Sequence, residues 1–320
     1  MLEHFGGKVK VLRLEKRISR EDLCGDESEL SVRQLARIEL GQSIPSLSKV
    51  IFIAKALNVS VGYLTDGADL ELPKRYKELK YLILRTPTYM DDGKLQVREE
   101  QFDEIFEDYY DKLPEEEKII IDCLQATLDT LLSENTNFGI DLLQEYFNQI
   151  KTKVRFRQND LILLELYLAY LDIEGMDGQY SDKIFYDSLL DNLSEQFEQF
   201  ELDELFIVNK IIIDISSLSL KNNRLDNLEK AIEMSQKIMA KIQDWNRMPI
   251  LKLIEWKYFL IKQKDIIKAE QSFMKACLFA QMTADQYLEN KLIQEWEKDV
   301  KSYQQDKNVI FKYLIVRYNS

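Results

Sequence analysis

The sequence predicts an all-α fold, in which a five-helix domain of 66 residues precedes a larger array of helices. Apolar residues recur at helical spacing through most of the chain, and short polar turns separate the helical segments. The charge balance also changes along the chain. Through Thr65 there are ten Lys and Arg against eight Asp and Glu, whereas the remainder carries 33 against 48. Because 320 residues exceed one ordinary compact core, we expect two domains.

Helix-start and helix-end signals divide the first 66 residues into five short helices. Ser19 is followed three residues later by Asp22, and Ser31 is followed by Gln34 at the same spacing. This is the pattern of a capping box, in which a side-chain oxygen accepts from the backbone of the first turn. Gly41 supplies the left-handed residue that ends the third helix. The remaining boundaries are predicted at His4, Arg17, Gly25, Pro45, Ser60 and Leu64.

The third of these helices has one apolar and one basic face. Leu35 and Ile38 are predicted to point inward, while Arg33 and Arg37 lie four residues apart on an outward face. An arginine can pair with guanine or bind a phosphate, so this face suits a nucleic-acid contact. The alternative, that both arginines are ordinary solvated residues, stays open at this point.

The remainder of the chain is predicted to form a degenerate solenoid of roughly ten or eleven amphipathic helices. Residues 269–276 have the pattern of the second helix of a tetratricopeptide repeat, but the spacing of about 34 residues is not kept. We expect a linker over residues 67–74, the helical-repeat domain over 75–304, and a C-terminal tail or last helix over 305–320.

Composition argues against several classes of protein. The single histidine, His4, disfavours histidine-rich metal sites and histidine-dependent hydrolases. The three cysteines, Cys24, Cys123 and Cys277, are far apart and are predicted to be buried thiols. No phosphate-binding glycine loop, secretory signal or membrane-spanning run is present. We therefore expect a cytoplasmic protein that is not an enzyme and uses no cofactor, metal or membrane.

Two stretches carry a specific resemblance. Residues 31–47 and 53–60 resemble the Cro/repressor-type (XRE) helix-turn-helix, with Arg-Ile-Glu-Leu-Gly, Pro-Ser-Leu and Ile-Ala-Lys-Ala-Leu in order. Together with the helical body, the chain resembles the peptide-pheromone receptors of Gram-positive bacteria, the Rgg, PlcR and PrgX group, and within it the ComR competence regulators. The carrying residues are 19–24, 30–39, 87–89, 113–117 and 275–280.

The resemblance implies a quorum-sensing regulator that a short hydrophobic peptide activates, as a dimer, on a palindromic promoter. It implies peptide contacts at Thr88, Arg98 and Asn209 in the helical-repeat domain. Asn209 interrupts an apolar run, and a buried amide there can bond a peptide backbone. Arg98 suits a peptide carboxylate. The DNA-binding residues that we predict on the helix-turn-helix are Ser31, Arg33, Gln34, Arg37 and Ser43.

Three alternatives to a peptide-gated regulator remain open on the sequence. The first is a regulator with the same head that a protein partner or small molecule controls, and the second is a toxin–antitoxin or phage-type repressor whose body only oligomerises. The third is an enzyme, which the missing motifs disfavour. The aromatic side chains of the body are expected to pack rather than bind ligand. These are Tyr167, Tyr170, Phe185, Trp245 and Trp256.

The charge asymmetry also predicts a resting-state latch. Glu115, Glu116 and Glu117 begin a helix after Pro114, and we expect them to pair with Arg33 and Arg37. Acids in a first turn are also favoured by the helix dipole, which is the competing explanation for this run.

Overall fold

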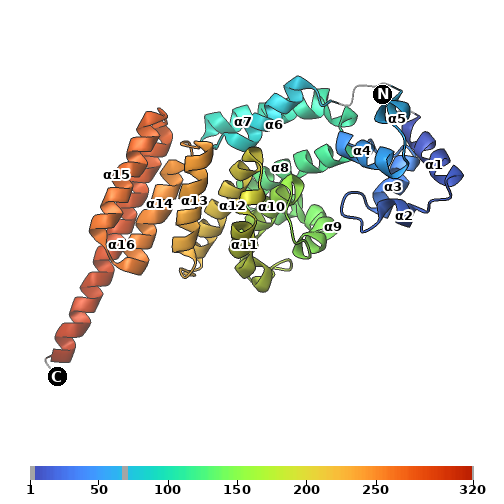
Figure 1. Cartoon of the computed structure of the whole chain (residues 1–320). Helices are drawn as coiled ribbons and strands as arrows, with labels where there is room; N and C mark the ends of the chain where they lie inside the picture. The colour runs from blue at the N-terminus through green and yellow to red at the C-terminus, as the bar shows by residue number, and fades with distance from the viewer. Residues whose placement is uncertain (1–3, 67–70, 319–320) are drawn as a thin grey trace. The chain divides into compact units, whose positions relative to one another are not determined.

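The structure is a computed structural model that describes residues 4–66 and 71–318, with side chains described as far as Gln305. Its secondary structure is helical, which confirms the predicted all-α class (Figure 1). The chain forms two compact units, and each is described by itself. Unit 1 comprises residues 1–83 and 97–125, and unit 2 comprises residues 84–96 and 126–320. The predicted domain boundaries at 66 and 74 stay predictions.

The N-terminal five helices of unit 1 are called the head. They are α1 (Phe5–Glu15), α2 (Arg20–Cys24), α3 (Val32–Glu39), α4 (Leu47–Ala56) and α5 (Val61–Thr65). Ser19 and Ser31 form the predicted capping boxes, and Ser46 and Ser60 cap the two helices that follow them. Gly41 follows α3 with a left-handed φ of 70°. Five helices of these lengths enclose one core, centred on Val9, Leu35, Ile53 and Leu57.

Close packing of α1 on α3 depends on a glycine. A Cβ at Gly6 would lie 1.9 Å from the backbone oxygen of Ile38, closer than any real contact. Gly6 therefore lets the two helices approach, and this approach fixes α3 on the head.

The rest of unit 1 is formed by α6 as far as Ile83 and by parts of α7 and α8. Their bounds, with the intervening 3-10 turn η1, are α6 (Lys74–Arg85), α7 (Asp92–Asp108), η1 (Tyr110–Lys112) and α8 (Glu115–Ser133). Tyr76, Leu79 and Ile105 are buried among them. Arg75 Nε donates to Glu104 Oε1 at 2.7 Å and thereby joins α6 to α7.

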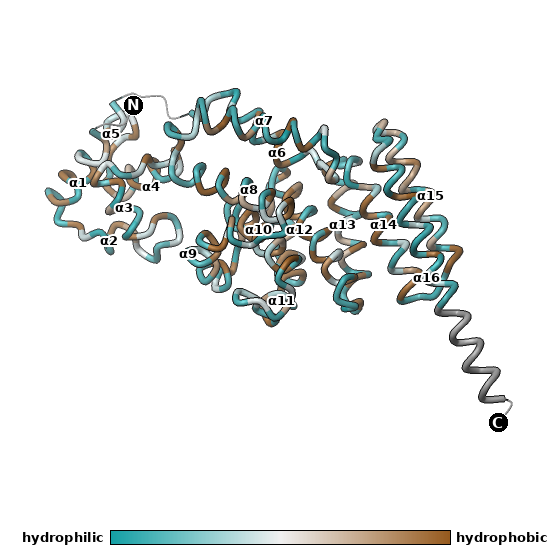
Figure 2. Tube along the Cα trace, turned by 180° about the vertical axis from the view of Figure 1, so that it is seen from behind, coloured by the Kyte–Doolittle hydropathy of each residue, from teal (hydrophilic) through white to brown (hydrophobic). Residues whose placement is uncertain are grey.

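Unit 2 continues as stacked helices. They are η2 (Thr136–Phe138), α9 (Ile140–Lys151), α10 (Gln158–Glu174), α11 (Lys183–Glu195), η3 (Phe197–Gln199), α12 (Leu202–Lys221), α13 (Leu228–Ile242), α14 (Met248–Tyr258), the π-helical turn η4 (Phe259–Gln263), α15 (Ile266–Met282) and α16 (Gln286–Tyr318). Figures 1 and 2 both show α13, α14 and α15 side by side, and Figure 2 shows apolar segments where neighbouring helices meet. This is the predicted repeat-like body.

Apolar side chains between successive helices form the core of unit 2. One cluster joins α12, α13 and α14 through Ile213, Met239 and Leu251. A second, around Trp256, holds α16 against α14 and α15. Trp256 Nε1 also donates to Asp299 Oδ2 at 2.8 Å, so the N–H group of the buried indole has a hydrogen-bond partner.

One expectation needs correction. Cys277 is only partly buried, whereas Cys24 and Cys123 are buried as expected. Trp245 packs as expected, because its ring stacks on that of Phe279, although 44 % of the residue stays exposed. The backbone of α16 runs as one helix from Gln286 to Tyr318, and the boundary expected at 304 stays a prediction. Among the described residues, no helix is long and apolar enough to cross a membrane.

Candidate DNA-binding surface and peptide site

Helix α3 presents the predicted DNA-binding face. Leu35 and Ile38 are 0 % and 2 % exposed, so they point into the core as predicted. Arg33 is exposed on that face, and the Arg37 side chain is 40 % exposed. The side chains of Ser31 and Gln34 are engaged with each other's backbone, in bonds of 3.2 and 3.3 Å. The N-terminal turn of α3 is therefore held rigid beside the arginines.

A buried ion cluster fixes the C-terminal end of α3. The Glu39 side chain is fully buried and accepts from Arg13 Nε at 2.6 Å and from Arg20 Nε at 2.9 Å. Burial by itself raises the pKa of the Glu39 carboxyl, but the hydrogen bonds from Arg13 and Arg20 hold that pKa below its ordinary value. The cluster ties α1, α2 and α3 together.

The first turn of α8 covers part of the predicted DNA-binding residues within unit 1. Arg37 Nη1 donates to Glu115 Oε1, and Ser43 Oγ donates to Glu115 Oε2. The backbone N–H of Glu115 also donates to the oxygen of Ile44 at 3.2 Å. One carboxylate thus engages two of the five residues that we predict to contact DNA.

The two neighbouring acids have other partners. Glu116 pairs with Lys49 of α4, whose Nζ lies 2.9 Å from Glu116 Oε1. Glu117 pairs with Lys80 at 2.7 Å and accepts from the Tyr76 hydroxyl at 2.5 Å. Both Lys80 and Tyr76 belong to α6. Sequence reasoning named the three acids but missed Ser43, Lys49 and α6 as their partners.

Asn209 is the most informative of the predicted peptide-binding residues. It is 0 % exposed, and its Oδ1 accepts from Ser235 Oγ at 2.6 Å. Its Nδ2 is buried and has no hydrogen-bond partner among the described residues. A buried amide donor without an acceptor costs free energy, so this donor suits an acceptor oxygen supplied from outside the described residues.

Thr88 lies in the turn between α6 and α7, which belongs to unit 2. Its backbone oxygen accepts from Asp91 N at 3.0 Å, and Tyr89 and Met90 after it have left-handed φ angles of 52° and 59°. The turn is anchored to later helices, because Tyr287 donates to Met90 O at 2.9 Å and Tyr89 donates to Asn246 O. The strained backbone presents Thr88 from a fixed turn.

Charged residues that sequence reasoning did not single out lie around α12. Lys210 Nζ donates to Glu165, a carboxylate 3 % exposed on α10. Burial raises the pKa of the nearby Asp214 carboxyl to about 7, and Lys210 partly offsets this rise. Arg247 donates to Leu84 O at 3.0 Å and so joins the end of α6 to α14. The sequence contains a signal for these charged residues, because Lys210 and Asp214 interrupt the same apolar run as Asn209.

Arg98, the third predicted peptide-binding residue, lies on the part of α7 that belongs to unit 1. Its Nη1 donates to Ile83 O at 2.7 Å. Thr88 and Asn209 both belong to unit 2. The prediction that all three side chains contact one peptide therefore stays a prediction. Among the described residues, no group of histidine, cysteine and carboxylate side chains is placed to hold a metal ion.

A capped helix-turn-helix head and a tetratricopeptide-like body define the class of protein: a two-part helical regulator. Comparison with known families makes this specific. The ComR tetratricopeptide family matches residues 73–296, and the helix-turn-helix family matches residues 9–64. The chain belongs to the ComR family.

Solved structures support the assignment. ComR from Streptococcus suis is 35 % identical over 93 % of this chain and 96 % of that chain, with a TM-score of 0.77. Apo ComR from Streptococcus vestibularis is 29 % identical over 93 % and 98 %, with a TM-score of 0.75. ComR from S. thermophilus, in complex with DNA and its signalling peptide ComS, is 27 % identical over 92 % and 99 %, with a TM-score of 0.66. None of the curated protein sequences is significantly similar to the chain.

Proposed function

We propose that this protein is a transcription regulator that binds a palindromic promoter as a dimer when a short hydrophobic peptide occupies its helical-repeat domain. The S. thermophilus relative was solved with DNA and a signalling peptide, which supports both partners. Competence is the process that we propose it regulates. The single observation that carries the proposal is the engagement of Arg37 and Ser43 by Glu115.

A carboxylate bound to an arginine occupies the same donors that a DNA phosphate or a guanine edge uses. Arg37 cannot serve both partners fully, so the Glu115 contact and DNA binding compete. A ligand that favours the state without this contact therefore raises DNA affinity, in proportion to its preference for that state. This competition gives the helical body a physical means to control the head.

Peptide binding is proposed at Thr88, Arg98 and Asn209. The buried, unpartnered Nδ2 of Asn209 is a donor for a peptide carbonyl. Thr88 presents a hydroxyl from its anchored turn, and Arg98 supplies a cation for a carboxylate.

The proposal predicts that peptide raises operator affinity and that Asn209→Ala weakens the response. A thermal-shift screen of short hydrophobic peptides identifies a ligand, because binding to the native state raises the unfolding temperature. Fluorescence polarisation then measures that peptide with wild type and with Thr88→Ala, Arg98→Ala and Asn209→Ala. Loss of one good hydrogen bond should weaken binding by about 0.5–1.5 kcal/mol, and loss of a charged one by about 1.5–3 kcal/mol.

The matched control is Asn222→Ala, an exposed amide that bonds only its own helix at Leu218 O within the described residues. It should bind peptide like wild type. Wild-type affinity in all three test variants would reject the proposed contacts. If no peptide in the screen shifts the unfolding temperature or the operator affinity, the protein is instead a repressor whose body only oligomerises or binds a protein partner.

A further inference from the structure

A cavity of about 300 Å³ lies where α11, α12 and α13 meet. Its apolar floor is formed by Leu190, Ile215, Leu228 and Ala231, which come from all three helices. The cavity is separate from the residues predicted to bind peptide, because Ile215 and Ser219 belong to the C-terminal half of α12 and Asn209 belongs to its N-terminal half. Its volume is at the lower limit of small-molecule sites.

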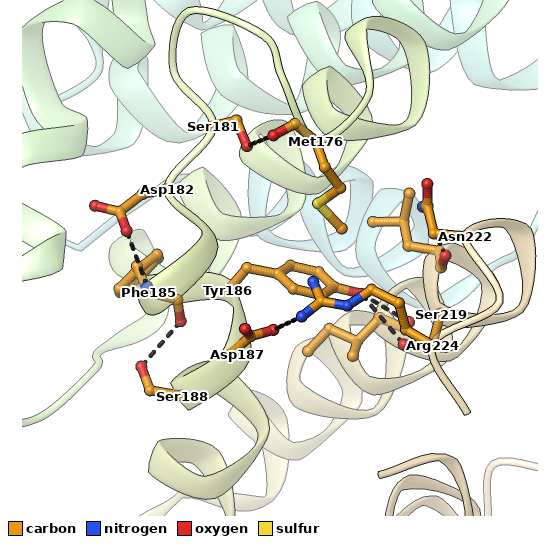
Figure 3. Close-up of polar contacts among 12 residues, drawn as sticks. Met176, Ser181, Asp182, Phe185, Tyr186, Asp187, Ser188, Ser219, Asn222 and Arg224 are labelled. Carbon is orange, nitrogen blue, oxygen red and sulfur yellow. Dashed lines mark hydrogen bonds and ion pairs between the residues drawn. The ribbon is translucent and has the colours of Figure 1, made fainter. Parts of the chain in front are cut away.

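One side of the cavity is polar and built from paired groups (Figure 3). The hydroxyl of Tyr186 is buried and lies 3.2 Å from Ile215 O and 3.3 Å from Ser219 Oγ. These contacts hold the phenol ring in place against α12. The guanidinium of Arg224 lies over that ring, with its central carbon 5.6 Å from the ring centroid.

Arg224 is held in a fixed orientation, but its hydrogen-bond donors are not all used. Its Nη2 donates to Asp187 Oδ1 at 2.5 Å, and the Arg224 side chain is 38 % exposed. Within the described residues, Asp187 is its one side-chain hydrogen-bond partner. A guanidinium has five N–H donors, so donors remain for a ligand in the cavity. Asp187 and the aromatic face fix the guanidinium orientation, which reduces the entropy lost on binding.

The remaining charges select the kind of anion. Asp187 and Asp226 both line the cavity, and Asp226 is also paired with Lys262 at 3.2 Å. Arg224 and Lys262 thus balance these two carboxylates, and a lining without excess positive charge disfavours a dianion such as a phosphate monoester. A singly charged carboxylate meets less repulsion, and its apolar body covers the aliphatic floor.

We propose that this cavity binds a small monocarboxylic acid with an apolar body, held at its carboxylate by Arg224 and at its body by Leu190, Ile215 and Leu228. The site adds a second ligand to the helical body, and it does not rest on the proposed peptide function. Because the ligand would bridge three helices, it should also stabilise their packing.

The test uses the full chain and a panel of defined acids: butyrate, hexanoate, octanoate and 3-phenylpropionate. Saturation-transfer NMR detects binding, and isothermal titration measures affinity. The neutral amide of 3-phenylpropionate keeps the apolar body and removes the charge. At least one acid should bind, and its amide should bind roughly tenfold more weakly or worse.

Two variants locate the site. Arg224→Gln should weaken binding of the acid roughly tenfold and leave the amide unchanged. Asn227→Trp places a large side chain at an exposed lining position and should block acid and amide alike. Arg155→Gln removes an exposed arginine elsewhere in unit 2 and should bind like wild type.

The proposal is overturned if no acid of the panel binds the wild type. It is equally overturned if acid and amide bind alike, or if the Arg224 and Asn227 variants both keep wild-type affinity. None of these outcomes depends on DNA or peptide binding, so this test and that of the proposed function fail separately.

Discussion

Glu39 is a fully buried carboxylate whose arginine partners come from two different helices. The Arg13 side chain is itself only 8 % exposed, so removing the carboxylate leaves a cation buried without its counter-charge. Breaking such a pair on one side costs about 3–5 kcal/mol. We therefore expect Glu39→Gln to lower the free energy of unfolding of the head by several kcal/mol, measured by urea unfolding near neutral pH.

The ion pair between Glu39 and Arg13 also makes the destabilisation by Glu39→Gln depend on pH. The pKa of Glu39 is lowered in the folded protein, so its contribution is fully present above the ordinary value of 4.5 and is lost as pH falls through the folded-state pKa. The stability difference between wild type and Glu39→Gln should shrink at low pH. Glu15→Gln, an exposed acid on α1, is the control. A difference that stays constant with pH would contradict the electrostatic explanation.

At the scale of elements, two adjacent glycines on α1 give a matched pair. A Cβ at Gly6 meets the backbone of α3, whereas a Cβ at Gly7 meets nothing within 4 Å. Gly6→Ala should destabilise by about 1–3 kcal/mol or more, because a backbone must move to make room. Gly7→Ala should stabilise by roughly 0.5–1 kcal/mol, because alanine favours the helix. Thermal unfolding of both variants tests the pair, and a destabilised Gly7→Ala would contradict it.

The starts and ends of helices were predicted well where the residues that determine them lie within a few positions of each other. Ser19 and Ser31 bond backbone groups three residues away, and Gly41 acts on its own dihedral angle, so the sequence contains the whole interaction. Trp245 shows the limit. Its aromatic character predicted packing, which its stacking on Phe279 confirms, but the identity of that partner, 34 residues later, depends on the fold.

At the scale of the molecule, charge asymmetry predicted that acids after Pro114 meet arginines of α3. One pairing, between Arg37 and Glu115, is present. The acids also meet Ser43, Lys49 and Lys80, because the backbone bond from Glu115 to Ile44 sets which side chains come close. The spacing of residues in the sequence does not show which of these side chains will meet. Net charge predicts that two surfaces attract but not which residues pair.

We propose that the latch depends on Glu115 and not on Glu117. Glu115 engages Arg37 and Ser43, whereas Glu117 engages Tyr76 and Lys80 of α6. Both acids lie in the first turn of α8, so both are favoured by the helix dipole. Glu115→Ala should raise operator affinity without peptide, whereas Glu117→Ala should leave it near wild type. A dipole effect alone would make the two variants alike.

The expected gain follows from what Glu115 contributes. A partly exposed ion pair is worth about 0.2–1 kcal/mol, and a charged hydrogen bond from Ser43 adds about 1.5–3 kcal/mol. Their loss should raise basal affinity roughly tenfold or more, since 1.4 kcal/mol is a factor of ten. Mobility shift on a duplex selected from a random pool by the full chain measures this. Arg33→Ala and Arg37→Ala should lose about 1–3 kcal/mol of operator binding, if each contacts a base. If Glu115→Ala binds DNA like wild type at both low and moderate salt, the head is held at rest by contacts other than this carboxylate.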